Sequence, residues 1–197
     1  MATSSSPDRP PDGSSIEVAI IGSARIGPED PRYSDAERLG AALAGEGWTV
    51  VTGGYGGLMG AAATGARSVG GHTIGLPMSA WKHLTPHESH TQLRWSADYA
   101  ERLRHLLAAD VVVALPGGLG TLSEASIVWA AAQTEANTPA LVLVGTVWTK
   151  LAEVFGRELV IDDSDLAVAH QMHTIDDVVS VIHDLLNTPR NEGTARG

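Results

Sequence analysis

The apolar residues of this chain fall into short runs that are separated by longer amphipathic segments. Runs of strand length occupy residues 16–21, 48–51, 72–76, 111–115 and 140–144, and a weaker run occupies residues 166–169. Segments with apolar residues at helical spacing predict helices over residues 35–44, 58–69, 98–108, 119–133 and 147–155. A last helix is predicted to begin at Thr174, whose hydroxyl can cap it by accepting from the amides of Asp176 and Asp177.

This alternation predicts the α/β class. Strands that are apolar throughout are typical of a parallel sheet covered by helices on both faces, and right-handed crossovers then give a doubly wound, Rossmann-like sheet. The chain of 197 residues is long enough for one such domain, which we place at residues 16–187. Residues 1–15 and 188–197 are predicted to be disordered tails. Residues 77–97 show no period, and a loop of that length in a compact domain is usually functional.

Composition narrows the possible partners. The formal net charge of −10 argues against a nucleic acid or an anionic membrane as partner. The absence of cysteine excludes disulfides and thiolate chemistry. No apolar run reaches the roughly 18–20 residues that a membrane span needs, and the first residues lack the apolar core of a secretory signal. We therefore expect a cytoplasmic protein.

Glycine-rich turns follow three of the predicted strands. The residues concerned are Gly22, Ser23 and Arg25 after the first strand, Gly53, Gly54, Gly56, Gly57 and Met59 after the second, and Pro116, Gly117, Gly118, Gly120 and Thr121 after residues 111–115. The carboxyl ends of parallel strands meet at one edge, so these turns are predicted to line one crevice, where free amides and helix N-termini attract a phosphate. Tight turns also use glycine for their backbone geometry alone, but three glycine-rich turns at one edge of a sheet indicate a bound ligand. Neither the G-x-G-x-x-G nor the Walker A pattern occurs.

One acid, Glu124, lies in the first turns of the helix after the third of these turns. A carboxylate there can stabilise an oxocarbenium-like sugar and activate water, although an acid near a helix N-terminus is also favoured by the helix dipole alone. Arg102, in the preceding helix, can serve a phosphate or this carboxylate. Alternatively, it lies on a solvated helix face and pairs with Asp98 at i,i+4.

Three histidines in the irregular segment, His83, His87 and His90, have the spacing of metal ligands on a helix. Pro86 lies between them and favours a turn over a helix. We therefore predict no metal site and no cofactor, and a loop that covers the site and contacts substrate or a partner subunit.

Residues 116–124, PGGLGTLSE, resemble the PGGxGTxxE motif of the Lonely Guy family, formerly mislabelled lysine decarboxylases. Residues 53–60, GGYGGLMG, are similar to its GGG-x-x-GLMG turn, with Tyr55 in place of the third glycine. The resemblance extends from about Val18 to the last helix. It implies a Rossmann-like homodimer, or a higher homo-oligomer, whose ligand is a small-molecule nucleotide. Such enzymes hydrolyse cytokinin riboside 5′-monophosphates or AMP to the free base and ribose 5-phosphate, without a metal.

The resemblance also assigns roles to residues. Glu124 matches the glutamate that acts on the ribose and the attacking water. The phosphate-binding turn is matched by Gly117, Gly118, Gly120 and Thr121, and Gly22-Ser23 match the family's Gly-Ser. Phosphoribohydrolases of the family carry an Arg-Lys pair where this chain has Glu101-Arg102. Two hypotheses follow: a hydrolase in which Glu124 and Arg102 are catalytic, with Arg104 or Arg25 assisting, or a non-catalytic protein that binds a nucleotide or the molybdenum cofactor.

Overall fold

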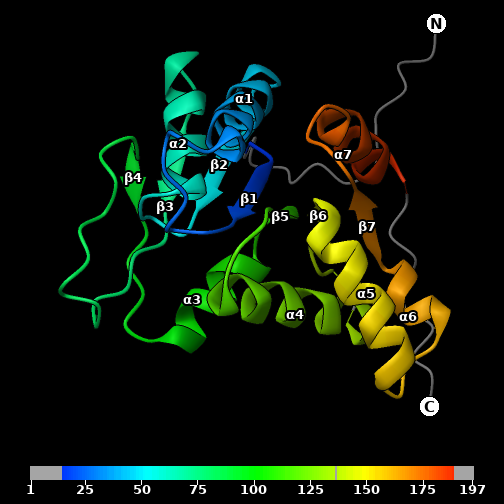
Figure 1. Ribbon diagram of the computed structural model, residues 1–197. Helices are drawn as coiled ribbons and strands as arrows, with labels where there is room; N and C mark the ends of the chain where they lie inside the picture. Colours follow the sequence, from blue (N-terminus) through cyan, green and yellow to red (C-terminus); the bar gives the residue numbers. More distant parts are fainter. Residues whose placement is uncertain (1–14, 136, 189–197) are drawn as a thin grey trace, which may run out of the picture.

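A single parallel sheet organises the molecule. The computed structural model describes residues 15–135 and 137–188. Seven parallel strands lie in the order β4-β3-β2-β1-β5-β6-β7 (Figure 1). Their bounds are β1 Glu17–Ile21, β2 Thr49–Thr52, β3 Thr73–Gly75, β4 Gln92–Leu93, β5 Val111–Ala114, β6 Ala140–Val144 and β7 Ala169–Met172. The predicted α/β, Rossmann-like sheet is confirmed.

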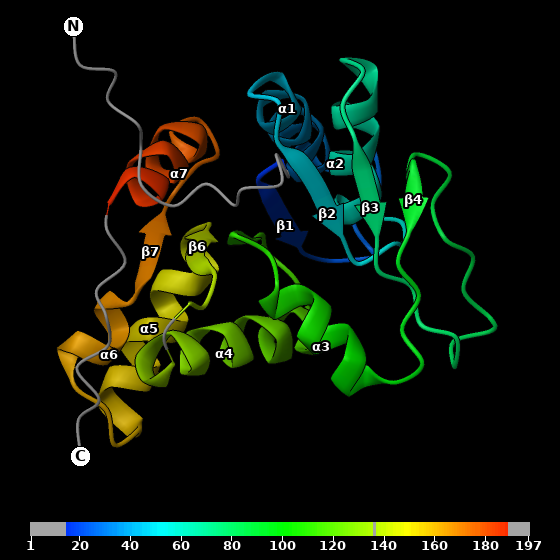
Figure 2. The same ribbon diagram turned by 180° about the vertical axis from the view of Figure 1, so that it is seen from behind.

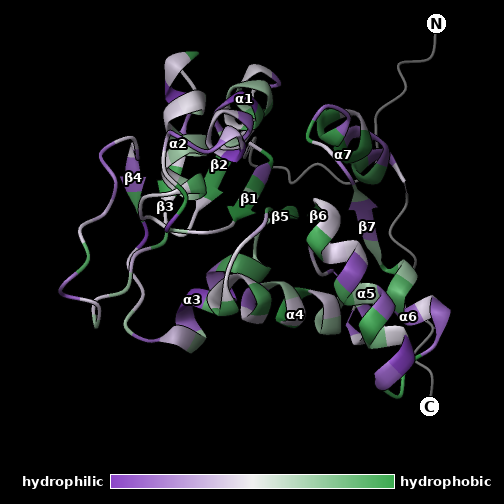
Figure 3. Cartoon of the chain, in the orientation of Figure 1, coloured by the Kyte–Doolittle hydropathy of each residue, from purple (hydrophilic) through white to green (hydrophobic). Residues whose placement is uncertain are grey.

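Helices cover both faces of this sheet (Figures 1 and 2). One layer holds α1 (Pro31–Gly45), α2 (Leu58–Ser68) and α7 (Val178–Asn187), and the other holds α3 (Tyr99–Leu107), α4 (Leu119–Thr134) and α5 (Thr146–Glu158), with α6 (Asp163–Ala167) beyond α5. Successive residues of β1 serve the two layers in turn: Ile20 packs into the core under α1, α2 and α7, and Ile21 into the core under α3, α4 and α5. Figure 3 accordingly shows hydrophobic colour on the central strands β1 and β2, whereas the edge strands β4 and β7 are largely purple.

Helices α1 and α2 pack closely enough for their backbones to touch. Gly40 of α1 lies against the carbonyl group of Ala62 in α2, and Gly65 of α2 lies against the carbonyl group of Glu37 in α1. A Cβ atom at either glycine would overlap the facing backbone. This contact fixes the position of α2, whose N-terminus ends the second glycine-rich turn.

The strand order reverses between β1 and β5, because β1 is followed by β2 on one side and β5 by β6 on the other. In sheets of this kind the ligand crevice lies at the carboxyl ends of the strands beside that reversal. The register aligns Ile21 of β1 with Ala114 of β5, and Ile20 with Thr52 of β2. The three glycine-rich turns therefore begin at nearly the same level of one edge.

The C-terminal part differs from the prediction in two places. The predicted strand at residues 166–169 is wrong: α6 ends at Ala167, and the strand is β7, Ala169–Met172. Helix α6 forms because Asp162 and Asp165 make a capping box, and β7 is an edge strand whose middle residues are exposed, so its apolar pattern is weak. The start at Thr174 is also wrong, because α7 begins at Val178.

The segment 77–97 contains one short strand that the pattern did not predict. Strand β4 pairs with β3 through Ile74↔Gln92 and Gly75↔Leu93, and it consists of two exposed residues, which are too few to give a periodic signal. The two predicted tails lie outside the described residues, apart from Ser15 and Thr188, so their disorder stays a prediction. None of the helices in the described part of the chain is long and apolar enough to cross a membrane.

Candidate functional site

Backbone hydrogen bonds join the three glycine-rich turns to one another. The amide of Ser23 donates to the carbonyl oxygen of Pro116 at 3.1 Å, and the amide of Leu58 donates to the carbonyl oxygen of Ser23 at 2.9 Å. The Ser23 hydroxyl accepts from the amide of Arg25 at 3.1 Å. Gly57, with φ +68°, lies against the Ser23 carbonyl, where a side chain would overlap it. The turn after β1 thus connects the turn after β5 to the start of α2.

The turn after β5 presents the N-terminus of α4 to solvent. Gly118 is the N-cap residue and no side chain caps the helix. The residues of this turn, Gly117, Gly118, Leu119 and Gly120, are exposed, whereas Thr121 is buried and packs on Gly117. Amides left free at a helix N-terminus, together with the helix dipole, suit an anion.

The other predicted ligand residues divide into buried and accessible ones. Gly22, Gly53, Gly54 and Met59 are buried, and Gly53 lies directly against the side chains of Arg102 and Met59. Ser23, Gly56, Gly57 and Pro116 are partly exposed. Arg25 is exposed and has no ion pair with any residue that the structure describes.

A buried ion pair lies beneath these turns. The Arg102 guanidinium of α3 contacts Oε1 of Glu124 in α4 twice: Nε donates at 3.0 Å and Nη2 lies at 3.0 Å. Its Nη1 donates to the carbonyl oxygen of Gly53 at 2.9 Å and to that of Leu76. Only 6% of the Arg102 side chain and 9% of the Glu124 side chain are exposed. The predicted alternative of a solvated face is therefore wrong for Arg102.

The N-terminus of α3 explains the roles of its neighbours. Asp98 is the N-cap, and its carboxylate accepts from the amide of Glu101 at 2.8 Å instead of pairing with Arg102. The Glu101 carboxylate in turn accepts from the amide of Ala97 at 2.6 Å. Glu101 thus serves the start of the helix, while Arg104, in the last turn, is exposed.

Burial and the neighbouring charge of Arg102 shift the pKa of Glu124 in opposite directions. Burial raises the pKa of its carboxyl group, and the charge and hydrogen bond of Arg102 partly oppose that rise. Both arginine contacts use Oε1, and no described residue gives a hydrogen bond to Oε2, which is not fully enclosed either. A cavity of about 10 Å³, the size of one water molecule, borders Glu124, Arg102 and Thr52. The site thus holds an oriented carboxylate with one available oxygen.

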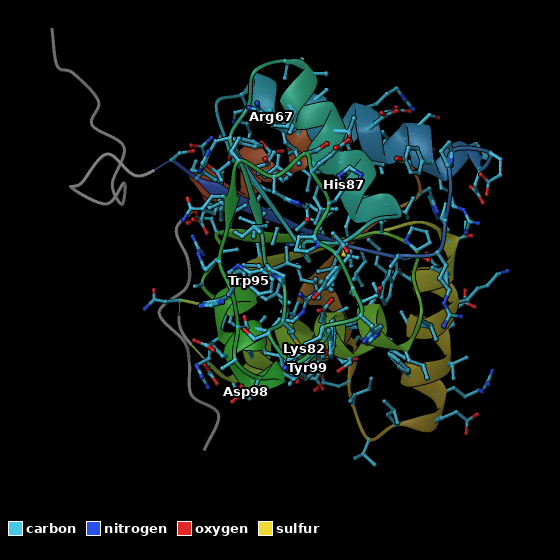
Figure 4. All side chains as sticks on the ribbon, turned by 90° about the vertical axis from the view of Figure 1, so that its left-hand side faces the viewer. Arg67, Lys82, His87, Trp95, Asp98 and Tyr99 are labelled. Atoms are coloured by element: carbon cyan, nitrogen blue, oxygen red, sulfur yellow. The ribbon has the colours of Figure 1, made fainter. Side chains whose placement is uncertain are left out.

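The segment 77–97, which carries Lys82, His87 and Trp95 in Figure 4, contacts both Tyr55 and the helix that holds Arg102. The amide of Met78 donates to the hydroxyl of Tyr55 at 2.9 Å, and Oγ of Ser96 lies 3.1 Å from Nδ1 of His105, one turn after Arg102 on α3. The indole ring of Trp81 lies over the guanidinium, with 5.6 Å between its centroid and Cζ of Arg102. The sequence interpretation missed Trp81 and the role of Tyr55. An aromatic residue in a long irregular segment was the available signal.

The His90 side chain holds this segment to the sheet. The amide of Gly54 donates to Oγ1 of Thr52 at 3.1 Å, so the Thr52 hydroxyl hydrogen is free for Nε2 of His90, 2.7 Å away. Nδ1 of His90 then donates to the carbonyl oxygen of His87 at 2.9 Å. Burial lowers the pKa of His90, which favours this neutral form. No group of three or more acidic, histidine or cysteine residues in the described part of the chain is placed to hold a metal.

A larger pocket of about 320 Å³ lies on the other side of the turn after β5, between α1, the start of α5 and the segment after β7. Its apolar floor includes Leu58, Leu115 and Val144, and its rim includes Arg32 and His173. It shares Pro116 with the glycine-rich turns, but neither Glu124 nor Arg102 lines it.

The fold and the joined turns define a Rossmann-like protein with three glycine-rich turns at the edge where the strand order reverses. The chain belongs to the SLOG cluster4 family, whose model matches residues 15–153. This match confirms the predicted relationship to the Lonely Guy proteins.

Similarity to individual proteins covers different shares of the chain. A Mycobacterium tuberculosis protein named cytokinin riboside 5′-monophosphate phosphoribohydrolase is 38% identical over 101 residues, which cover 48% of this chain and 52% of that protein. The chain thus spans about half the length of the curated relatives it matches.

Among solved structures, the molybdenum cofactor binding protein of Rippkaea orientalis has a TM-score of 0.70 at 22% identity, covering 88% of this chain and 99% of that one. The molybdenum cofactor carrier protein of Chlamydomonas reinhardtii has a TM-score of 0.68 at 21% identity, covering 89% and 100%. At these identities the likeness concerns the fold.

Proposed function

We propose that the protein is a phosphoribohydrolase of nucleoside 5′-monophosphates, which cleaves the N-glycosidic bond of a cytokinin ribotide or AMP to the free base and ribose 5-phosphate. The observation that carries the proposal is the buried pair in which Arg102 holds Oε1 of Glu124 and leaves Oε2 available, directly beneath a glycine-rich helix N-terminus. The name of the M. tuberculosis relative supports the same reaction.

The 5′-phosphate would bind the free amides of Gly118 and Gly120 at the start of α4, with Arg25 as the nearby exposed cation. The ribose would then lie over Glu124. Oε2 stabilises positive charge at C1′ and takes a proton from the attacking water, whose oxygen bonds to C1′ as the C1′–N bond breaks. The departing base takes up a proton, so the overall change is the addition of one water molecule.

Arg102, predicted to be catalytic, acts here as a positioning residue. Its donors already serve Glu124, Gly53 and Leu76, so it fixes the carboxylate and leaves the phosphate to the turns. The elevated pKa of Glu124 also suits a group that exchanges protons during turnover.

Chromatographic detection of free base tests the reaction. Purified protein is incubated with AMP, GMP, CMP, UMP and the ribotide of isopentenyladenine. The variant Glu124→Gln should lose at least about 100-fold in kcat, in line with general acid–base catalysis. Ser126→Ala, an exposed change on the same helix, should keep full activity. If the wild-type protein releases no base from any of these substrates, the hydrolase proposal is wrong.

A second candidate is a non-catalytic protein that binds a nucleotide or the molybdenum cofactor. It is favoured by Glu101, which stands where the family's phosphoribohydrolases carry the catalytic arginine and caps α3 instead. The names of the two structural relatives fit this candidate as well. Tight retention of ligand without turnover, unchanged in Glu124→Gln, would support it.

Assembly and location belong to the same proposal. We propose a homodimer, because Leu119 and Ile127 leave apolar surface on α4, where Leu119 is 85% exposed and Ile127 is 40% exposed. The proposed location remains the cytoplasm, as expected from the sequence. Light scattering on the purified protein as it leaves a size-exclusion column measures its mass directly. A monomeric mass at working concentration would contradict the dimer.

A further inference from the structure

We propose that Trp81 forms the subsite for the base, so that the heteroaromatic ring of the ligand stacks on its indole ring. This inference rests on the proposed nucleotide site and adds to it the group that recognises the base. Stacking on an aromatic side chain accepts any base, because every base has a π face. It therefore selects a heteroaromatic ligand over a bare sugar phosphate.

The indole is held in a fixed position. Its guanidinium partner, Arg102, is buried and anchored by Glu124, Gly53 and Leu76. The amide of Trp81 donates to the carbonyl oxygen of Met78 at 3.1 Å. The ring of Tyr55 lies 5.7 Å away, tilted by 37°. Trp81 nevertheless stays partly exposed, so the residue keeps surface that a ligand can reach.

The position of Glu124 decides on which side the base lies. A carboxylate that acts at C1′ requires the glycosidic bond beside it, and the base is attached to C1′ directly. Glu124 and Trp81 contact the same guanidinium, so a base leaving the ribose over Glu124 meets the indole.

The pocket of about 320 Å³ does not fit this requirement. It lies on the α1 and α7 side, across the turn after β5, and it includes neither the carboxylate nor the guanidinium. A base placed there would direct the sugar away from Glu124. The two locations are distinguishable by mutation, because Val147 lines the pocket while Trp81 does not.

Calorimetry of AMP and of ribose 5-phosphate tests the proposal, in a Glu124→Gln background that blocks turnover. Trp81→Ala should weaken AMP binding by about 5- to 100-fold, the range expected from loss of one base stack, and should leave ribose 5-phosphate binding unchanged. Trp81→Phe should recover most of the AMP affinity. Trp95→Ala, an exposed tryptophan of the same segment, is the matched control and should bind both ligands normally.

Three results would overturn the subsite. Equal weakening of AMP and ribose 5-phosphate in both Trp81 variants would make Trp81 a purely structural residue. Loss of AMP binding in Val147→Trp, with normal binding in Trp81→Ala, would place the base in the larger pocket. AMP binding no tighter than ribose 5-phosphate in the wild type would show that no base subsite exists. A protein that binds AMP through Trp81 but releases no base keeps the subsite and refutes only the hydrolase.

Discussion

The buried pair of Arg102 and Glu124 makes a quantitative prediction about stability. Replacing Arg102 with methionine keeps most of the side-chain volume but removes the positive charge and every donor. Glu124 is then a buried carboxylate without a counter-ion, and the carbonyl oxygens of Gly53 and Leu76 lose their donor. Nothing else in the described structure gives Glu124 a cation.

Breaking one partner of a buried ion pair costs about 3–5 kcal/mol, and each orphaned buried acceptor costs about 1–3 kcal/mol more. Protonation of Glu124 and entry of water relieve part of this. We therefore expect Arg102→Met to lower the free energy of unfolding by about 4 kcal/mol, a large share of the roughly 5–15 kcal/mol typical of a domain. The double variant Arg102→Met/Glu124→Leu should regain much of that loss, because an apolar pair leaves no unpaired charge.

Urea unfolding at two pH values measures these quantities through the midpoint and the slope. Burial raises the pKa of Glu124 already, and loss of Arg102 raises it further. The folded variant therefore binds a proton that the unfolded chain, with an ordinary carboxyl pKa, does not bind, and the deficit of Arg102→Met shrinks as pH falls from 8 towards 5. A deficit below about 1 kcal/mol, or one that is the same at both pH values, would refute this account of the ion pair.

Three further predictions concern the turns and the segment 77–97. Gly118→Asp adds a carboxylate in open space at the proposed phosphate site, so KM for AMP should rise at least about tenfold. Gly118→Ala, the control, should leave KM nearly unchanged. Equal changes of KM in the two variants, measured by steady-state kinetics, would contradict the placement of the phosphate at Gly118. Gly57→Ala should lower the free energy of unfolding in urea by at least about 2 kcal/mol, because φ of Gly57 is positive and the Ser23 carbonyl group occupies the place of a Cβ atom. Gly56 has open space and no positive φ, so Gly56→Ala should lower it by less than half as much. Burial lowers the pKa of His90 in the folded protein, so the stability of the wild type should fall as the pH drops below the unfolded value near 6.5. The stability of His90→Gln should fall less. An equal loss of melting temperature in both proteins between pH 7.5 and pH 5.5 would contradict the role of His90 in holding the segment 77–97.

The fold class and the meeting of the turns at one edge followed from local signals in the sequence, whereas no strand order was predicted. The runs at residues 111–115 and 140–144 are apolar throughout because β5 and β6 are buried on both faces. Strand β4 left no such signal, since its two exposed residues are held by hydrogen bonds to β3 alone. Helix α6 is short, and the sequence interpretation overlooked the capping acids Asp162 and Asp165.

The candidate site was predictable only where its residues are close together in the sequence. Glu124 and the glycines of the turn after β5 lie within one contiguous motif, residues 116–124, so their residue types and spacing were informative. The environment of Arg102 depends on Gly53, Leu76 and Trp81, which come from three other segments. Local spacing allowed an exposed pair with Asp98 equally well. Only tertiary packing selects between a solvated arginine and a buried one.

The connection of the three turns through Ser23 bears on how the family can diversify. The contacts that join them use the amide and carbonyl groups of Ser23 and not its side chain, so most substitutions at the crevice leave this frame intact. The segment 77–97, which carries Trp81, is fastened to Tyr55 of the second turn and takes no part in the contacts of Ser23 described above. Substitutions in that segment can therefore change the side chains beside the proposed phosphate site without changing the contacts that join the three turns.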